Sequence, residues 1–394
     1  MSYGPLLVFL LALLGLTGPA SAQTAAAAVR IGLDAEFGLD NSTSAQAIEL
    51  GMKIAIAEVN AAGGVLGGRP LELVKRDNRS VPARTQANLR EFAAMPDLVA
   101  VFGGKFSPVV LEAVPLVHEL QLPFMAVWSS ADPIVDNQRQ PNFVFRLALR
   151  DSLAMPHLLA HASKRGVDKV GLLLANTGWG RSNLLAAERY VAGGRKPALA
   201  RVVWHNWGEK SLLQRYQLLR EAGAGAVVVV ANDDDAALLV REVAALPKAE
   251  RLPILCHQGI TGGQFAALAG PALREVDLSV LQTFSFFSLA AGPRDRFLKS
   301  AREVAGIQRI DDITAPTGVA HAYDMVHLLA LAIRRAGSSE RTAVRAALEH
   351  LPEHRGLVRT YRPAFTAERH EALGPAELLM ARYREDGVLV PAGK

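Results

Sequence analysis

Short apolar runs alternate with longer amphipathic stretches from residue 29 to near the end of the chain. Each run has the length of a strand and is bounded by polar or glycine residues, which is the pattern of buried strands. The strands predicted in this way are Val29–Asp34, Leu71–Arg76, Leu98–Phe102, Phe124–Trp128, Lys169–Ala175, Ala226–Ala231, Pro253–Cys256 and Leu278–Phe284. Because most of the runs are nearly continuous in apolar residues, they indicate parallel sheets covered by helices on both faces.

The segment Ser44–Asn60 is typical of the helices expected between these strands. It carries apolar residues at helical spacing, namely Ile48, Met52, Ala55, Ile56 and Val59. Hydroxyl side chains at 42–44 can cap its start, and the glycines at 63–64 can supply the left-handed backbone that ends it. Strands and helices therefore alternate along the chain.

The length of the chain bears on the number of lobes. At 394 residues, it exceeds the size at which one hydrophobic core keeps growing, so two lobes are expected. The formal net charge is +5, but Lys and Arg are interspersed with Asp and Glu and form no basic stripe. This distribution argues against nucleic acid as a partner.

The N-terminus has the pattern of an export signal. An apolar run, Leu6–Leu16, precedes the helix breakers Gly18 and Pro19 and the small residues 20–22. The run is shorter than a membrane span needs, and the small residues match the site that signal peptidase accepts. The sequence predicts a signal peptide of residues 1–22, cleaved after Ala22, and a periplasmic location.

A single cysteine, Cys256, lies within a predicted strand. One cysteine cannot form an internal disulfide, and a free cysteine in an apolar run is usually a buried thiol. We therefore expect Cys256 to be part of a core.

The residues that follow the strands are the candidates for a ligand site, because ligands bind beyond the carboxyl ends of strands in parallel sheets. These loops are Asp34–Phe37, Gly103–Ser107, Ser129–Asp132, Asn176–Gly180, Asn232–Asp234 and His257–Gly259. All of them carry hydrogen-bonding groups, and two add a large aromatic side chain. Such a combination predicts a small-molecule site.

Several short motifs occur together in one order along the chain. They are the helix and double-glycine turn Gly51–Gly68, then Phe102–Gly104 with Ser107, Leu122–Pro123, Ser129–Pro133, Phe145–Arg146, Trp179–Gly180 and Ala322–Asp324. From about Val29 to its end, the chain resembles the type I periplasmic binding proteins of the leucine/isoleucine/valine-binding branch. This resemblance implies an α/β fold of two Rossmann-like, doubly wound lobes joined by a three-strand hinge. The implied limits are residues 29–149 plus 281–373 for lobe 1, and 150–280 plus 374–394 for lobe 2.

The same resemblance implies a function. Members of the family close two lobes on a solute and deliver it to the permease of an ABC transporter, which carries branched-chain or related amino acids, amides or other small acids. We expect a binding protein rather than an enzyme, without a cofactor or metal, and a monomer. Two alternatives remain: a ligand-sensing receptor or regulator domain of the same fold, and an α/β hydrolase. Against the hydrolase, the sequence has no G-x-S-x-G elbow, H-E-x-x-H motif or P-loop.

In the family, hydroxyl residues in two loops of the first lobe hold the ligand's carboxylate. The matching positions are Ser107 and the stretch of Ser129, Ser130 and Ala131. Hydroxyls and backbone amides at helix starts favour an anion. Ala131 replaces the usual threonine, so only its backbone amide can serve. The lobe 2 aromatic matches Trp179, which suits a flat or aliphatic ligand face.

One departure from the family concerns the ligand's ammonium group. Amino-acid binders hold it with an acidic residue at the position that matches Gln258, which is neutral. An amide pairs with a desolvated ammonium much more weakly than a carboxylate does, although Asp233, Asp234 or Glu36 could substitute. The sequence therefore predicts a small carboxylic acid or amide, including aromatic ones, rather than leucine.

The remaining candidate ligand-binding residues are Asn232, Asp233, Phe37 and Lys105, the last as a positive charge beside the carboxylate site. The three aspartates at 233–235 also resemble a metal cluster. They lack the spacing of a calcium loop, so we interpret them as the acidic first turn of a helix. Arg146 is interpreted as a structural ion-pair residue.

Overall fold

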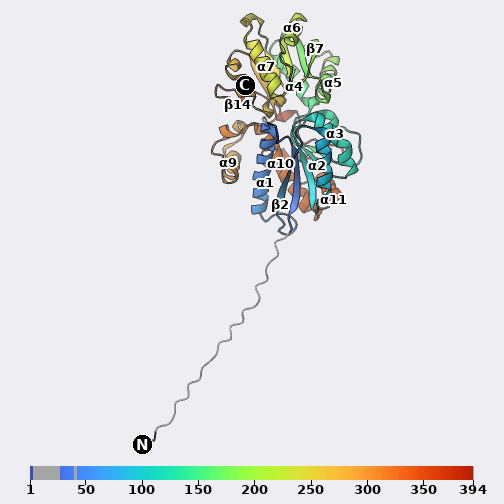
Figure 1. Ribbon diagram of the computed structural model, residues 1–394, viewed down its shortest axis with the longest axis vertical. Coiled ribbons are helices and arrows are strands. Elements are labelled where there is room, and N and C mark those ends of the chain that lie inside the picture. Colours follow the sequence, from blue (N-terminus) through green and yellow to red (C-terminus); the bar gives the residue numbers. More distant parts are fainter. Residues whose placement is uncertain (3–26, 40–41, 394) are drawn as a thin grey trace.

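The computed structural model describes residues 1–2, 27–39 and 42–393, and it consists of two α/β lobes stacked end to end (Figure 1). The apolar run and the cleavage site of the predicted signal peptide lie outside the described residues. Within the described part of the chain, no helix combines the length and apolarity that a membrane crossing requires.

The first lobe is built on a five-stranded parallel sheet with the order β2-β1-β3-β4-β5. Its strands are β1 (Val29–Ala35), β2 (Leu71–Asp77), β3 (Leu98–Gly103), β4 (Phe124–Ala126) and β5 (Val144–Arg146). The register places Gly103 opposite Ala126. The loops that follow β3 and β4 consequently start side by side.

Helices cover both faces of this sheet. They are α1 (Thr43–Ala61), α2 (Pro82–Ala94), α3 (Ser107–Glu119) and, from later in the chain, α9 (Ala291–Ala305), α10 (Pro316–Ala336) and α11 (Arg341–Leu348). One core cluster joins α1, α10 and α11 to one face of the sheet, and another joins α2 and α3 to the opposite face. A small hairpin of β11 (His354–Arg355) and β12 (Thr360–Tyr361) follows α11.

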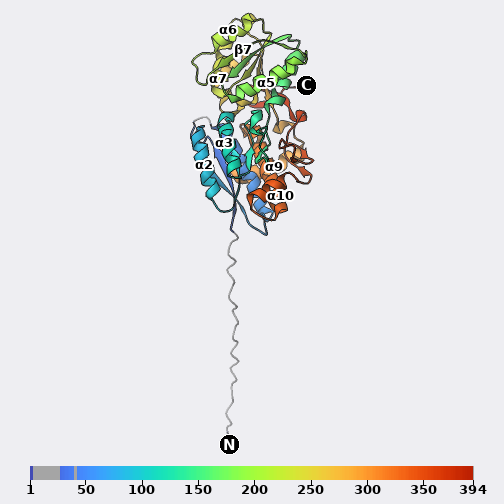
Figure 2. The same cartoon turned by 90° about the vertical axis from the view of Figure 1, so that its right-hand side faces the viewer.

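The second lobe holds a seven-stranded sheet with the order β14-β13-β10-β9-β8-β6-β7. Its strands are β6 (Lys169–Ala175), β7 (Ala198–His205), β8 (Ala226–Val230), β9 (Ile254–Cys256), β10 (Leu278–Gln282), β13 (Leu379–Tyr383) and β14 (Leu389–Pro391). Its helices are α4 (Asp151–Lys164), α5 (Gly178–Ala192), α6 (Leu213–Glu221), α7 (Asp233–Ala244) and α8 (Phe265–Ala269). β6 to β10 are parallel, while the last two strands run antiparallel. The last two strands thus belong to the second lobe, which is the upper lobe in Figures 1 and 2.

All eight predicted strands are present, and the expected helix after β1 is α1. The glycines at 63–64 have positive φ angles, as predicted for the end of that helix. The predicted cap is wrong: no cap hydrogen bond comes from the side chain of Ser42, whose hydroxyl instead donates to the Phe37 carbonyl at 3.5 Å. Cys256 is fully buried, and burial raises its thiol pKa.

A close approach of α1 and α10 explains one glycine of the family motif. A Cβ atom added at Gly51 would lie 2.1 Å from the Val319 carbonyl oxygen, which is a backbone atom and cannot rotate away. We expect Gly51→Ala to lower the free energy of unfolding by about 1–3 kcal/mol through overpacking, as measured by urea denaturation. Gly292→Ala is the control, because its added Cβ would meet only the Arg296 Nη1 atom, 3.6 Å away. Equal stability of both variants would contradict the close approach.

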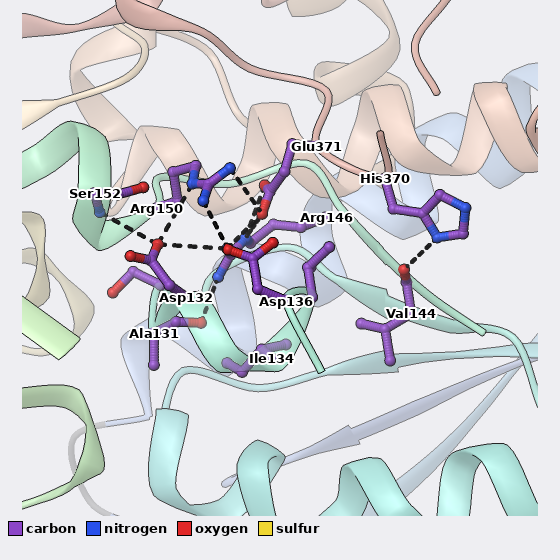
Figure 3. Close-up of polar contacts among 12 residues, drawn as sticks. Ala131, Asp132, Ile134, Asp136, Val144, Arg146, Arg150, Ser152, His370 and Glu371 are labelled. Carbon is purple, nitrogen blue, oxygen red and sulfur yellow. Dashed lines mark hydrogen bonds and ion pairs between the residues drawn. The ribbon is translucent and has the colours of Figure 1, made fainter. Parts of the chain in front are cut away.

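A buried arginine ties two of the segments that pass between the lobes (Figure 3). Arg146 at the end of β5 is fully buried and donates through Nε to both Glu371 carboxylate oxygens, at 3.1 and 2.9 Å. Its Nη1 donates to the Ala131 carbonyl at 2.8 Å. Burial alone would lower the pKa of Arg146, but Glu371 opposes this and the net shift is upward. The interpretation of Arg146 as a structural ion-pair residue is confirmed.

Candidate ligand-binding cleft

A narrow cavity, with free volume for about one water molecule, lies between the two lobes. It is lined by Lys105, Phe106, Ser107, Pro108, Trp128, Ser130, Trp179, Trp207, Asn232, His257, Gln258 and Gly259. All of these residues follow the carboxyl ends of strands, with the first six in lobe 1 and the others in lobe 2. This is the place where parallel α/β sheets bind ligands.

Six of the predicted site residues line this cavity, namely Lys105, Ser107, Ser130, Trp179, Asn232 and Gln258. The other four, Phe37, Ser129, Ala131 and Asp233, are not in its lining. The Ser129 hydroxyl is used within lobe 1, where it donates to the Gly104 carbonyl at 2.7 Å. Phe37 packs against the lobe 1 core and lies under the Lys75 ammonium.

Ser107, the first residue of α3, organises the hydroxyl-rich loop. Its Oγ accepts hydrogen bonds from the backbone amides of Ser130 at 3.2 Å and Ala131 at 3.3 Å. The two backbone amides are therefore bonded to Ser107, and the Ser107 hydroxyl is the group that they hold in place. Because the oxygen already accepts two N–H groups, the hydroxyl proton remains to be donated into the cavity.

Trp179 forms part of the lobe 2 wall. Its ring packs edge-on against His257 with centroids 5.1 Å apart, and Gly259 leaves room for it, since a Cβ there would lie 2.4 Å from the indole. The indole Nε1 is buried without a hydrogen-bond partner among the described residues. A buried unpaired donor is costly, so we expect this N–H to donate to a ligand acceptor.

His257 is held by its neighbours. Its Nδ1 accepts from the Gly259 amide at 3.2 Å, which places the ring proton on Nε2. That nitrogen lies 3.3 Å from Oδ1 of Asp151, which is fully buried. The Asp151 carboxylate contacts His257 but is not part of the cavity lining.

Gln258 is also tied to the protein. Its Oε1 accepts a hydrogen bond from the Thr283 hydroxyl at 3.2 Å, and that hydroxyl lies 3.0 Å from Nε2 of His321 in α10. Burial lowers the pKa of His321 to about 4, so the ring is neutral near pH 7. The Gln258 side chain is thus linked through Thr283 to His321 of α10.

Three aromatic residues of the wall were not predicted. Phe106 and Trp207 come from different lobes, and their ring centroids are 5.3 Å apart. Trp128 was predicted to be the last residue of a strand, but β4 ends at Ala126 and Trp128 belongs to the loop that follows. Trp207 follows β7, an edge strand of alternating burial that the search for wholly apolar runs missed. Recognising β7 would have revealed Trp207 as another residue at a strand end.

The aspartates at 233–235 form the first turn of α7, as expected. Asp233 is buried and its Oδ1 lies 3.4 Å from the Lys105 ammonium, across the cleft. Asp235 accepts from the Gly208 amide at 3.0 Å. These carboxylates serve protein contacts and the helix start.

A larger hollow lies elsewhere between the lobes, bordered by the segments 261–274, 310–316 and 382–389. None of the predicted site residues lines it. The smaller cavity is therefore the candidate site, because it alone of these two collects the residues at the strand ends.

The fold and the position of the cavity agree with a known family. A family model described as periplasmic binding protein matches residues 28–387. The chain belongs to the periplasmic binding protein family. The predicted resemblance to its type I leucine/isoleucine/valine-binding branch is confirmed, as is the α/β fold with two lobes. The family consists of periplasmic substrate-binding proteins.

Individual members of the family resemble the chain over nearly its whole length. It is 24% identical over 368 residues to the Leu/Ile/Val-binding protein homolog 2 of Brucella abortus, covering 92% of this chain and 93% of that protein. A periplasmic binding protein type 1 from Bordetella pertussis superposes with a TM-score of 0.81 at 19% identity, covering 93% of this chain and 100% of that one. An ABC transporter solute-binding protein of R. palustris in complex with benzoate gives a TM-score of 0.74 at 16% identity, with coverage of 93% and 96%.

Proposed function

We propose that this chain is the solute-binding component of an ABC importer, exported to the periplasm by its predicted signal peptide. Its ligand is a small carboxylic acid or amide rather than leucine. The observation that carries this proposal is the cavity between the lobes, which combines hydroxyl, indole and amide groups with aromatic rings from both sides. No acidic side chain is present among the described residues that line it.

The predicted carboxylate site receives support from helix orientation. α3, α5 and α7 all begin beside the cavity, and a residue at the start of each lines it: Ser107, Trp179 and Asn232. The N-terminus of a helix favours an anion through its free amides and its dipole. The relatives show that the fold serves more than one ligand class, because one is named for Leu/Ile/Val and another contains benzoate.

Solute uptake follows from closure of the lobes. Contacts already join them around the cavity: the Asp132 amide donates to the Ser182 hydroxyl at 3.0 Å, and Phe106 meets Trp207. A solute that touches both lobes favours the closed form by its differential contacts. The permease then recognises the closed arrangement.

A screen of candidate solutes tests this function. Aromatic, aliphatic and hydroxy acids and their amides are expected to raise the melting temperature at micromolar concentrations, because binding to the folded state alone stabilises it. Small-angle scattering with the best compound should show compaction or retention of the compact form. Stabilisation by branched-chain amino acids alone would contradict the proposed ligand class, and turnover of a bound compound would contradict a binding role.

A further inference from the structure

Lys105 spans the cleft from lobe 1 to a carboxylate of lobe 2. Its Nζ lies 3.4 Å from Oδ1 of Asp233 and donates to the Gly262 carbonyl at 3.1 Å. Both side chains are almost fully buried, with exposed fractions of 4% and 2%. Burying an ammonium and a carboxylate is costly unless they are paired, so each of these charges depends on the other.

The aliphatic part of Lys105 is also fitted to its place. Gly262 leaves the room for it, since an added Cβ there would lie 3.0 Å from the Lys105 Cδ. The ammonium lies 4.9 Å from the centre of the Phe106 ring, a distance at which a cation is attracted by the ring face. Lys105 is therefore held in the cavity wall by contacts with both lobes.

The carboxylates of Asp233, Glu36 and Asp151 lie outside the lining of the cavity. Asp233 pairs with Lys105, and its Oδ2 accepts from the Gln264 amide at 3.2 Å. Glu36 accepts from the Ser44 hydroxyl at 2.6 Å. Asp151 is fully buried, and its Oδ1 lies 3.3 Å from Nε2 of His257. A ligand ammonium would find no carboxylate among the described residues that line the cavity.

We propose that Lys105 supplies from within the protein the ammonium group that an amino acid would bring, and that the cavity therefore selects carboxylic acids without an α-amino group. This inference rests on the proposed function and narrows its ligand class. An amino acid in this cavity would place a second ammonium near Lys105, where repulsion and desolvation oppose binding.

The test compares two pairs of compounds that differ only in the amino group: 4-methylpentanoate with leucine, and 3-phenylpropanoate with phenylalanine. Isothermal titration calorimetry on the wild-type protein should show the acid of a pair binding at least about tenfold more tightly than its amino acid. In Lys105→Met, which keeps the apolar stem, Asp233 becomes free for a ligand ammonium. The ratio of the two affinities, acid over amino acid, should then fall by at least about tenfold.

Two further variants show whether the shift arises from this pair. The double variant K105M/D233N should lose the gain in amino-acid binding, because no carboxylate remains. Lys53→Met should leave the ratio unchanged, since Lys53 is exposed on α1 and pairs with Glu49.

An unchanged ratio in Lys105→Met would overturn this inference while leaving the proposed function intact. If neither compound of either pair bound to any variant, the proposed function would fall and the inference with it. Should Lys105→Met fail to fold, the wild-type ratio decides, because tighter binding of the amino acids would overturn the selection on its own.

Discussion

Glu371→Ala is expected to lower the free energy of unfolding by about 3–5 kcal/mol, because it leaves the buried charge of Arg146 without the carboxylate that it hydrogen-bonds. The remaining carboxylate, Asp132, is 4.0 Å from Nη2. Arg146 has no exposed surface, and Glu371 accepts hydrogen bonds from both Nε and Nη2 of its guanidinium. The two residues come from different passages of the chain between the lobes, 225 positions apart (Figure 3). Urea denaturation followed by circular dichroism measures the effect.

The chain offers a matched control for this variant. Arg362 and Glu353 form a similar two-bond contact, at 2.7 and 3.3 Å, but they lie on the surface. Exposed pairs contribute little because water solvates both charges. Glu353→Ala should therefore leave the denaturation midpoint almost unchanged, and a loss as large as that of Glu371→Ala would show that burial of Arg146 is not the cause.

Trp179→Ala is expected to weaken binding of the best solute by more than about tenfold, since the lost contact should exceed about 1.4 kcal/mol. The indole covers part of the lobe 2 wall, and its buried N–H has no partner among the described residues. The hydrogen bond from this N–H to a ligand oxygen would be lost together with the ring. Titration calorimetry gives the affinity of each variant.

Trp204→Ala separates this effect from a general loss of stability. Trp204 belongs to the same lobe but does not line the cavity. We expect its replacement to leave the affinity within about twofold, because it removes no contact with the ligand. If Trp179→Ala bound as tightly as the wild-type protein, Trp179 would not be part of the site.

The wholly apolar runs largely determined the fold. A strand that is buried on both faces is apolar at nearly every position, so β1, β3, β6 and β8 could be read directly from the sequence. The missed strands are short or lie near an edge, as β7 and β14 do, and polar residues interrupt them. At an edge, one side faces solvent, and the continuous pattern is lost.

Strand ends also predicted much of the candidate site, because the carboxyl ends of parallel strands meet at one edge whatever the loops contain. This reasoning placed Ser107, Trp179 and Gln258 near one another before any contact was known. It could not tell whether a side chain at a strand end points into the cavity. Ser129 and Ser130 are neighbours in sequence, yet only Ser130 lines the cavity.

The sequence by itself determined most strands of the two sheets, the family and the edge at which a ligand is expected, because these depend on local periodicity and on motifs within short stretches. Only the tertiary structure decided which charges meet. Lys105 and Asp233 are 128 positions apart and belong to different lobes, so no local pattern links them. The strength of an electrostatic interaction depends on the distance between the charges after folding. Lys105 was predicted to contact the ligand, and the structure shows that it also pairs with Asp233 across the cleft.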